Sequence, residues 1–161
     1  MSTPPLLIVT DLDSTLLGDN TSLKEFNRLF QQHSKSYGSK LVYATGRSLI
    51  LYQELKSEVD LLPPDMLITS VGSEIHNTNR VRDININRVR DIGWENIISQ
   101  DWDVEIVKEI AHGYQQLRPQ PESEQGPFKV SFLLDPGHQT ILEDLKTELI
   151  TRDIQAQIIY S

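Results

Sequence analysis

Two carboxylates stand one residue apart at the end of an apolar run, and no other junction of the chain points as clearly to chemistry. Residues 6–9 read Leu-Leu-Ile-Val, which is typical of a buried parallel strand, and Asp11 and Asp13 follow directly. Open α/β sheets place their active sites at the carboxyl ends of such strands. Close carboxylates repel each other, which favours either a bound divalent cation, with Mg²⁺ the natural hard-oxygen guest, or retention of a proton by one of them. A plain Asx turn after a strand explains the same residues without a ligand.

A pair of this kind can transfer a phosphoryl group. One carboxylate attacks phosphorus, while its neighbour protonates the leaving oxygen and later activates water. A second apolar strand, residues 40–44, ends in Thr-Gly-Arg-Ser at 45–48, before a helix that the pattern predicts over 49–59. A hydroxyl, a glycine amide and a helix start together form an anion site that fits a phosphate. The alternative is a simple strand-turn-helix in which Ser48 is the N-cap.

The elements that must position these groups follow from apolar periodicity and from capping signals. A capping-box pattern, Ser-Leu-Lys-Glu at 22–25, predicts the start of a helix that returns the chain from the first strand to the second. Farther along, Asp101 and Asp103 precede a predicted helix, where acids suit the helix dipole better than a metal site. The other expected elements are a strand at 66–70, helices at 104–117 and 141–152, and an alternating strand at 128–134.

The order of these motifs resembles a known superfamily. Asp-x-Asp-x-Thr after the first strand and Thr-Gly-Arg after the second are similar to the haloacid dehalogenase (HAD) phosphatases. Residues 67–75, 118–120 and 128–132 further resemble the sucrose-phosphate phosphatases within that superfamily, and the likeness runs from about Leu6 to the last residue. The resemblance implies an α/β fold with a HAD-like, doubly wound (Rossmann-like) core at residues 1–74, incomplete in this chain, and an inserted α+β cap at 75–161.

The resemblance also implies roles for residues that match the motifs. Asp11 is the expected nucleophile, which becomes an aspartyl-phosphate and also binds Mg²⁺. Asp13 is the expected general acid and base, with its backbone carbonyl on the metal. Thr45 and the Gly46 amide would bind the phosphoryl group, and Arg47 would line the cleft. The alternative for Arg47 is a surface partner for an acidic side chain.

Other matching residues would recognise the sugar. Those expected to border the sugar site at the entrance to the cap are Gly72, Ser73 and Glu74. Those expected to reach glucosyl hydroxyls from the cap are Gln120, Lys129 and Ser131. Sugar sites use a few convergent polar groups of this kind. The alternative for the cap residues is a solvated strand face.

The implied function is Mg²⁺-dependent hydrolysis of sucrose 6-phosphate to sucrose and phosphate, the last step of sucrose biosynthesis. Members of the superfamily also carry a later lysine and an acidic pair, yet no Gly-Asp-x-x-x-Asp pattern occurs in this sequence. We therefore expect the chain to be the first part of a longer protein. Two alternatives stay open: a phosphatase for another sugar phosphate, and a non-catalytic sugar-phosphate-binding module. A related expectation is docking to sucrose-phosphate synthase.

Composition limits the remaining classes. A net charge of −8 argues against nucleic-acid or anionic-membrane binding. The sequence holds no cysteine and no apolar run near the roughly 20 residues of a membrane span, so we expect a cytoplasmic protein. One feature stands apart from this picture, because Asn-Arg-Val-Arg-Asp-Ile at 79–84 recurs at 87–92. An aspartate in each copy favours a self-neutralised loop over an anion site.

Overall fold

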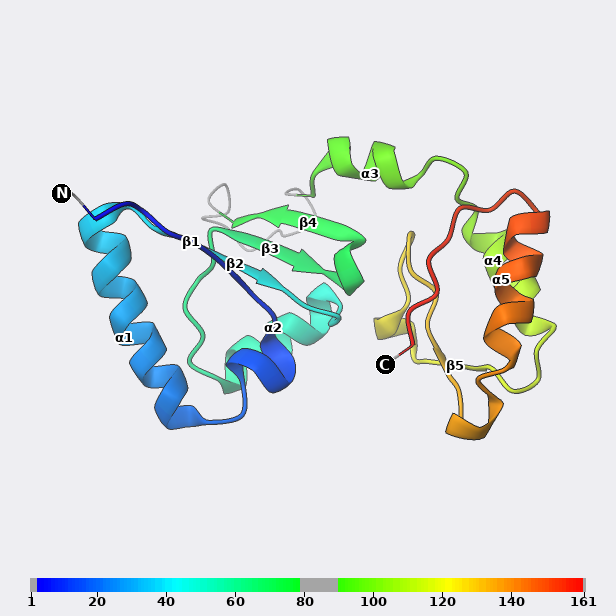
Figure 1. Cartoon of the computed structure of the whole chain (residues 1–161), viewed down its shortest axis with the longest axis horizontal. Helices are drawn as coiled ribbons and strands as arrows, with labels where there is room; N and C mark the ends of the chain where they lie inside the picture. Colours follow the sequence, from blue (N-terminus) through cyan, green and yellow to red (C-terminus); the bar gives the residue numbers. More distant parts are fainter. Residues whose placement is uncertain (1–2, 79–89, 161) are drawn as a thin grey trace. The chain divides into compact units, whose positions relative to one another are not determined.

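The structure, a computed structural model, describes residues 3–78 and 90–160 (Figure 1). The chain divides into two compact units, Met1–Ile92 and Gly93–Ser161. The sequence predicted a boundary near residue 74, and the first unit extends beyond it because strand β4 (Glu74–Asn77) pairs with strand β3 (Met66–Thr69). The assignment of the two parts to a core and a cap stays a prediction. The first copy of the tandem repeat and the start of the second lie outside the described residues.

The first unit is built on a four-stranded sheet with the order β1-β2-β3-β4. Strands β1 (Leu7–Thr10) and β2 (Lys40–Ala44) pair in parallel, and so do β2 and β3, while β4 runs antiparallel to β3. The three parallel strands confirm the predicted strands to within one residue. Strand β4 was not predicted as a strand of this sheet.

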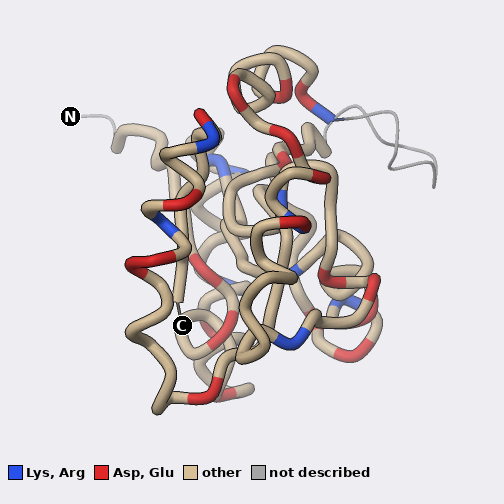
Figure 2. The backbone as a smooth tube through the Cα atoms, turned by 90° about the vertical axis from the view of Figure 1, so that its right-hand side faces the viewer, with Lys and Arg blue, Asp and Glu red and all other residues tan. Residues whose placement is uncertain are grey.

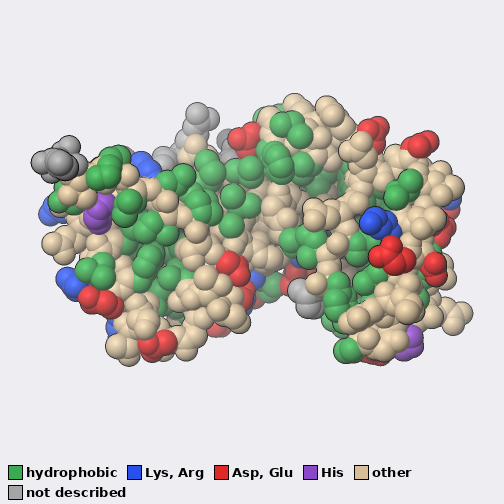
Figure 3. All heavy atoms as spheres, in the orientation of Figure 1, with side chains coloured by type: hydrophobic (Ala, Val, Ile, Leu, Met, Phe, Trp, Pro, Cys, Tyr) green, Lys and Arg blue, Asp and Glu red, His purple; other side chains and the backbone are tan. Residues whose placement is uncertain are grey.

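Two helices connect the parallel strands, as parallel pairing requires. Helix α1 (Asn20–Tyr37) joins β1 to β2, and helix α2 (Leu49–Glu58) joins β2 to β3. Apolar side chains from both helices and from the sheet form one core, whose members include Leu23, Phe30, Leu41, Tyr43, Tyr52, Leu55 and Leu67. Hydrophobic side chains also gather on the face of the first unit that Figure 3 shows, whereas acidic positions in Figure 2 are spread along the backbone.

The helix starts differ in one respect from the sequence prediction. The N-cap of α1 is Asp19, whose carboxylate accepts hydrogen bonds from the amides of Thr21 and Ser22 at 3.0 and 3.1 Å. The predicted capping box at residues 22–25 is therefore wrong, since an earlier acid already satisfies the free amides of the first turn. Glu25 pairs instead with Arg28 at 2.7 Å. Ser48 caps α2, as the alternative interpretation of this segment held, because its hydroxyl accepts from the Leu51 amide at 3.3 Å.

In its described residues, the second unit combines helices with a two-stranded antiparallel ladder. Helix α3 (Ile92–Ile98) begins at the boundary, and α4 (Val104–His112) and α5 (Ile141–Thr151) enclose a small apolar core with the members Ile110, Leu145, Leu149 and Ile154. The ladder pairs β5 (Arg118–Pro119) with β6 (Phe132–Leu133). As the helix-dipole argument expected, Asp103 is the N-cap of α4 and accepts from the amides of Glu105 and Ile106. Across the described ranges, no helix has the length and apolarity that a membrane span needs.

Two elements of the second unit are shorter than the sequence predicted. Helix α4 ends at His112 rather than near residue 117, where Gly113 follows as the C-cap. The strand predicted at 128–134 is reduced to Phe132–Leu133. Just before this short strand, the backbone of Ser131 binds the side chain of Gln125. Gln125 donates to the Ser131 carbonyl at 3.0 Å and accepts from the Ser131 amide at 2.9 Å. The Gln125 side chain thus binds the Ser131 amide that a longer ladder would use, although the backbone amide of Gln120 still donates to the Ser131 carbonyl.

Candidate active site

The predicted catalytic residues lie at the carboxyl ends of two adjacent strands. Asp11 follows the last residue of β1, and Thr45 follows the last residue of β2. Because β1 and β2 pair in parallel, with Thr10 opposite Tyr43, the two ends meet at the same edge of the sheet. This register brings the predicted carboxylates and the Thr-Gly-Arg segment to the same edge of the sheet, as the sequence predicted.

A tight turn after β1 separates the two aspartates. Leu12 is fully buried in the core and anchors the turn, while Asp11 and Asp13 on either side of it are exposed. Ser14 turns the chain with a φ of 57°, in the left-handed region. In the part of the chain that the structure describes, the Asp11 carboxylate accepts no hydrogen bond, which leaves it open to a ligand.

Arg47 forms a two-point ion pair with Asp13. The guanidinium Nε donates to Asp13 Oδ2 and Nη2 donates to Oδ1, both at 2.8 Å. These hydrogen bonds lower the pKa of Asp13, against a smaller opposing effect of burial. Asp13 is therefore held as a carboxylate. The alternative reading of Arg47, a partner for an acidic side chain, describes this contact, and the acid it binds is the predicted general acid itself.

The Thr45–Arg47 loop is tied to the turn that follows β3. Thr45 is buried, and its hydroxyl accepts from the Arg47 amide at 3.2 Å. The Ser70 amide donates to the Arg47 carbonyl at 2.8 Å, and the Val71 amide donates to the Thr45 carbonyl at 3.3 Å. A Cβ added at Gly46 would meet no atom within 4 Å, so space is open beside this loop. A backbone amide next to open space and at a helix start suits a phosphate.

The turn after β3 has an unusual backbone. Ser70, Val71 and Gly72 have φ values of 53°, 59° and 89°, three successive residues in the left-handed region. Such a conformation is costly for a β-branched valine and persists only where surrounding contacts hold it. The hydrogen bonds to the Thr45 and Arg47 carbonyls are contacts of that kind. Ser73 and Glu74, two of the residues expected at the sugar site, follow directly after this turn.

Glu74 has two hydrogen-bonding neighbours that sequence reasoning missed, and the charge of Arg90 also acts on it. Its Oε2 accepts from the Thr69 hydroxyl at 3.0 Å and lies 3.3 Å from His76 Nε2. The hydrogen bond from His76 is the main cause of a lowered pKa of Glu74, and the Thr69 bond adds to it against the effect of burial. The side chain of Glu74 is only 14% exposed. No motif signals Thr69 and His76, because only the pairing of β3 with β4 brings them together.

The lowered pKa of Glu74 predicts how the unfolding free energy depends on pH. The charged form of Glu74 is favoured in the folded state, so its contribution is complete above the ordinary value of 4.5 and is lost as the pH falls through the lower folded pKa. We expect wild type to exceed Glu74→Gln in unfolding free energy by about 1 kcal/mol at neutral pH. Urea unfolding at a series of pH values from 7 to 3 should show the difference shrinking in the acid range. A difference that is constant with pH would contradict the assignment.

The residues expected to contact sugar from the cap lie in the segments that flank the β5–β6 ladder of the second unit. The Gln120 amide donates to the Ser131 carbonyl at 3.0 Å. Lys129 Nζ pairs with Glu124 Oε2 at 3.0 Å, and both side chains are largely buried. The structure thus joins the backbones of Gln120 and Ser131, while the charge of Lys129, two residues before Ser131, is opposed by Glu124. Their contact with a sugar stays a prediction.

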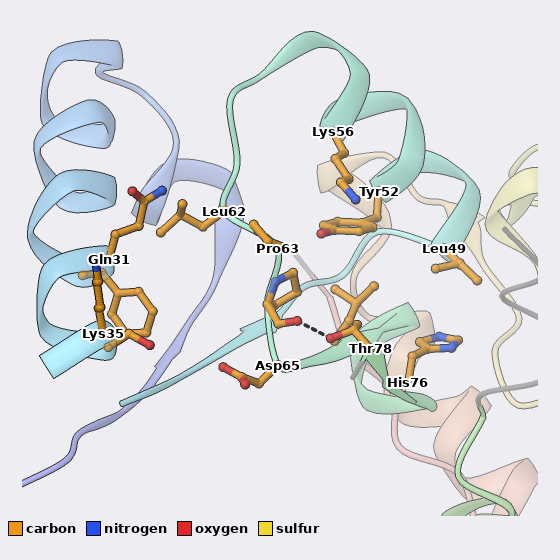
Figure 4. Close-up of a pocket in the computed structure, with 14 residues that line it drawn as sticks. Gln31, Lys35, Leu49, Tyr52, Lys56, Leu62, Pro63, Asp65, His76 and Thr78 are labelled. Atoms are coloured by element: carbon orange, nitrogen blue, oxygen red, sulfur yellow. Dashed lines mark hydrogen bonds between the residues drawn. The ribbon is translucent and has the colours of Figure 1, made fainter. Parts of the chain in front are cut away.

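A cavity of about 590 Å³ lies in the first unit, but it is not the predicted site (Figure 4). Asp65, directly before β3, and Thr78, directly after β4, both line it, which places it toward the opposite end of the sheet from Asp11. Figure 4 shows Tyr52 and His76 projecting from α2 and β4 around this space, and Thr78 hydrogen-bonded to Pro64. None of the residues predicted for catalysis or sugar binding lines the cavity.

The donor atoms at the end of β1 suit a hard divalent cation. Mg²⁺ in phosphoryl-transfer sites takes one or two carboxylates, and waters and substrate oxygens complete its six ligands. The Asp11 carboxylate and the Asp13 carbonyl are donors of this type. Among the described residues there is no group of three or more His, Cys, Asp or Glu side chains that could hold a metal alone. The residues therefore fit Mg²⁺ bound together with a phosphate better than a closed protein cage.

The sheet carries Asp-x-Asp after β1 and Thr-Gly-Arg after β2, and this α/β arrangement is that of the HAD-like fold. A haloacid dehalogenase-like hydrolase from Bacillus subtilis has the same fold, with a TM-score of 0.51 at 18% identity over 94% of this chain and 58% of that chain. The sucrose-phosphatase of Synechocystis sp. PCC6803, solved in complex with sucrose and phosphate, is closer. It matches with a TM-score of 0.84 and 33% identity over 98% of this chain and 61% of that chain.

The chain belongs to the sucrose-phosphatase family. The family model described as Sucrose-6F-phosphate phosphohydrolase matches residues 4–161. Probable sucrose-phosphatase 2 of Arabidopsis thaliana is 40% identical over 99% of this chain, and Sucrose-phosphatase 2 of Nicotiana tabacum is 39% identical over 97%. The chain spans 37% and 36% of the length of these two relatives. The predicted family and the HAD-like α/β fold class are confirmed.

Proposed function

We propose that this protein hydrolyses sucrose 6-phosphate to sucrose and phosphate through a phosphorylated Asp11. The observation that carries the proposal is the meeting of Asp11 and Asp13 with the Thr45–Arg47 loop at one edge of the sheet, in a chain of the sucrose-phosphatase family. An Asp11 oxygen attacks phosphorus as the bond from phosphorus to the sugar oxygen breaks, and Asp13 gives that oxygen a proton. Asp13 then takes a proton from water, which attacks phosphorus and releases Asp11.

Arg47 links substrate binding to the protonation state of Asp13. In the structure its guanidinium holds Asp13 as a carboxylate, which cannot donate a proton. A phosphate dianion is a stronger two-point partner for a guanidinium than a carboxylate is. An arriving phosphate would therefore draw Arg47 away from Asp13 and remove the contact that lowers the pKa of that carboxyl. Asp13 would become available as an acid only when substrate is present.

A divalent cation is part of this proposal, and Mg²⁺ is the ion that the donor set favours. The Asp11 carboxylate and the Asp13 carbonyl would hold it. The ion would supply positive charge that offsets the negative charge of the phosphoryl group. Thr45 and the Gly46 amide donate to the same group from the second strand end, where the open space beside Gly46 leaves room for it.

A phosphatase for another sugar phosphate is a second candidate. The mannosylfructose-phosphate phosphatase of Agrobacterium fabrum is 26% identical over 98% of this chain and 61% of that protein. Such an enzyme would share the aspartates and differ in the residues that contact the sugar. A non-catalytic binding module and docking to sucrose-phosphate synthase also stay proposals, as does the cytoplasmic location. Co-elution with a synthase, without phosphate release by the isolated chain, would support the docking role.

The test is phosphate release from sucrose 6-phosphate by the 161-residue chain with and without Mg²⁺. We expect turnover that EDTA abolishes and that added Mg²⁺ restores. Glucose 6-phosphate and mannosylfructose phosphate serve as comparison substrates, and far-UV circular dichroism confirms that the chain is folded. A folded chain that binds sucrose 6-phosphate without hydrolysing it would favour the binding module. Faster turnover of another sugar phosphate would reassign the substrate.

A further inference from the structure

Thr69, Glu74 and His76 form a closed polar cluster between strands β3 and β4. Thr69 Oγ1 lies 3.0 Å from Glu74 Oε2 and 3.0 Å from His76 Nε2, and the third side, from His76 Nε2 to Glu74 Oε2, is 3.3 Å. Thr69 is fully buried and His76 is 2% exposed. The strand register sets this geometry, because Thr69 is opposite Glu74 and Leu67 is opposite His76.

When Glu74 is charged and His76 is neutral, one placement of the protons satisfies all three contacts of the cluster. The carboxylate is an acceptor only, so the single hydroxyl hydrogen of Thr69 points to Glu74 Oε2. His76 then carries its proton on Nε2, and this N–H is shared between the Thr69 oxygen at 3.0 Å and Glu74 Oε2 at 3.3 Å. His76 Nδ1 has no hydrogen-bond partner among the residues that the structure describes. The polar contacts of both Thr69 and His76 are thus directed at one carboxylate.

Glu74, whose carboxylate contacts Thr69 and His76, follows shortly after the left-handed turn at residues 70–72. Thr69 directly precedes this turn, and Glu74 follows it after Ser73. The hydrogen bond from Thr69 to Glu74 therefore links the chain on the two sides of the turn. The turn is fastened to the Thr45 and Arg47 carbonyls, which belong to the proposed phosphate loop. The position of Glu74 is therefore fixed relative to the strand end at which the phosphate would bind.

We propose that Thr69 and His76 are positioning residues that hold the Glu74 carboxylate for recognition of sugar hydroxyls next to the phosphate loop. The inference rests on the proposed function and deepens it, since it assigns substrate preference to a buried pair that need not touch the substrate. A carboxylate held by two donors keeps one orientation at little entropic cost on binding. Its remaining oxygen is the hydroxyl acceptor.

The first test compares Thr69→Val with Thr69→Ser. Valine keeps the shape of threonine and removes the hydroxyl, whereas serine keeps the hydroxyl. We expect Thr69→Val to raise KM for sucrose 6-phosphate about tenfold, the loss expected when a hydrogen bond to a charged group is removed, and to leave KM for p-nitrophenyl phosphate unchanged. Thr69→Ser should behave as wild type on both substrates. Equal losses on both substrates in Thr69→Val would indicate a structural role and overturn the inference.

The second test asks whether the effect passes through Glu74. In a Glu74→Gln background, Thr69→Val should change KM for sucrose 6-phosphate far less than it does in wild type, because residues that act as a unit are not additive. Full additivity would overturn the inference. His76→Gln, whose amide reaches the place of Nε2, should retain more sugar preference than His76→Asn. A wild-type chain that hydrolyses neither substrate would overturn the proposed function itself, whereas an active chain with an unchanged KM in Thr69→Val would overturn the positioning role alone.

Discussion

Asp11→Asn is expected to abolish phosphate release from sucrose 6-phosphate while the chain stays folded. An amide is not a nucleophile toward phosphorus and binds a divalent cation more weakly than a carboxylate, so we expect a loss of at least about a thousandfold. The fold should tolerate the change, because Asp11 is exposed and its carboxylate takes part in no hydrogen bond within the described residues. A surface substitution of this kind changes stability by about 0.5 kcal/mol or less.

The measurement is steady-state phosphate release at saturating Mg²⁺, with urea unfolding of the same preparations. Asp60→Asn is the matched control, since it makes the same chemical change at an exposed aspartate in the loop before β3. The control should retain wild-type turnover. Turnover by Asp11→Asn at the wild-type rate would remove Asp11 from the nucleophile role. Loss of folding in Asp11→Asn would contradict the exposed, unbonded position that the structure gives this side chain.

The sheet could be predicted from the sequence because its strands are continuous apolar runs. Burial on both faces gives parallel strands this pattern, and residues 6–10, 40–44 and 66–70 show it. The expected burial is wrong for β1 in this structure, because Leu7 and Val9 are 67% and 56% exposed. Element ends were harder, since they depend on which of several polar groups reaches a free amide first. Asp19, rather than Ser22, accepts hydrogen bonds from the first-turn amides of α1. The Gln125 side chain accepts from the Ser131 amide, which a longer strand β6 would have used. Local competition of this kind leaves no periodic signal.

The candidate site divides in the same way. Asp11 and Thr45 could be placed together because parallel strands end at a common edge, a rule that needs no coordinates. The Arg47–Asp13 ion pair was foreseen only as a general alternative, since 34 residues separate its partners. The Thr69–His76 contact depends on β4, whose four residues give too short a pattern to identify a strand. Long-range pairs of polar side chains require the register, and the register comes from the fold.

Asp13→Asn is expected to separate the two chemical steps. Asparagine can neither protonate a leaving oxygen nor take a proton from water, so kcat for sucrose 6-phosphate should fall by about 10²- to 10⁴-fold. Stability should change little, because the Arg47–Asp13 pair is half exposed and such pairs contribute roughly 0 to 1 kcal/mol. The aryl phosphate p-nitrophenyl phosphate behaves differently, since its phenolate leaves without help from an acid.

With that substrate, transfer to Asp11 should survive in Asp13→Asn while hydrolysis of the phosphorylated aspartate is slow. Rapid mixing should therefore give a burst of about one p-nitrophenol per chain, followed by slow turnover. The same variant should give no burst of sucrose from sucrose 6-phosphate, because the sugar alkoxide cannot leave unprotonated. Absence of a burst with the aryl phosphate would mean that Asp13 is needed before phosphorus is attacked. The role of this carboxylate would then be to fix Arg47 and the metal, and the acid that protonates the sugar would have to be another group.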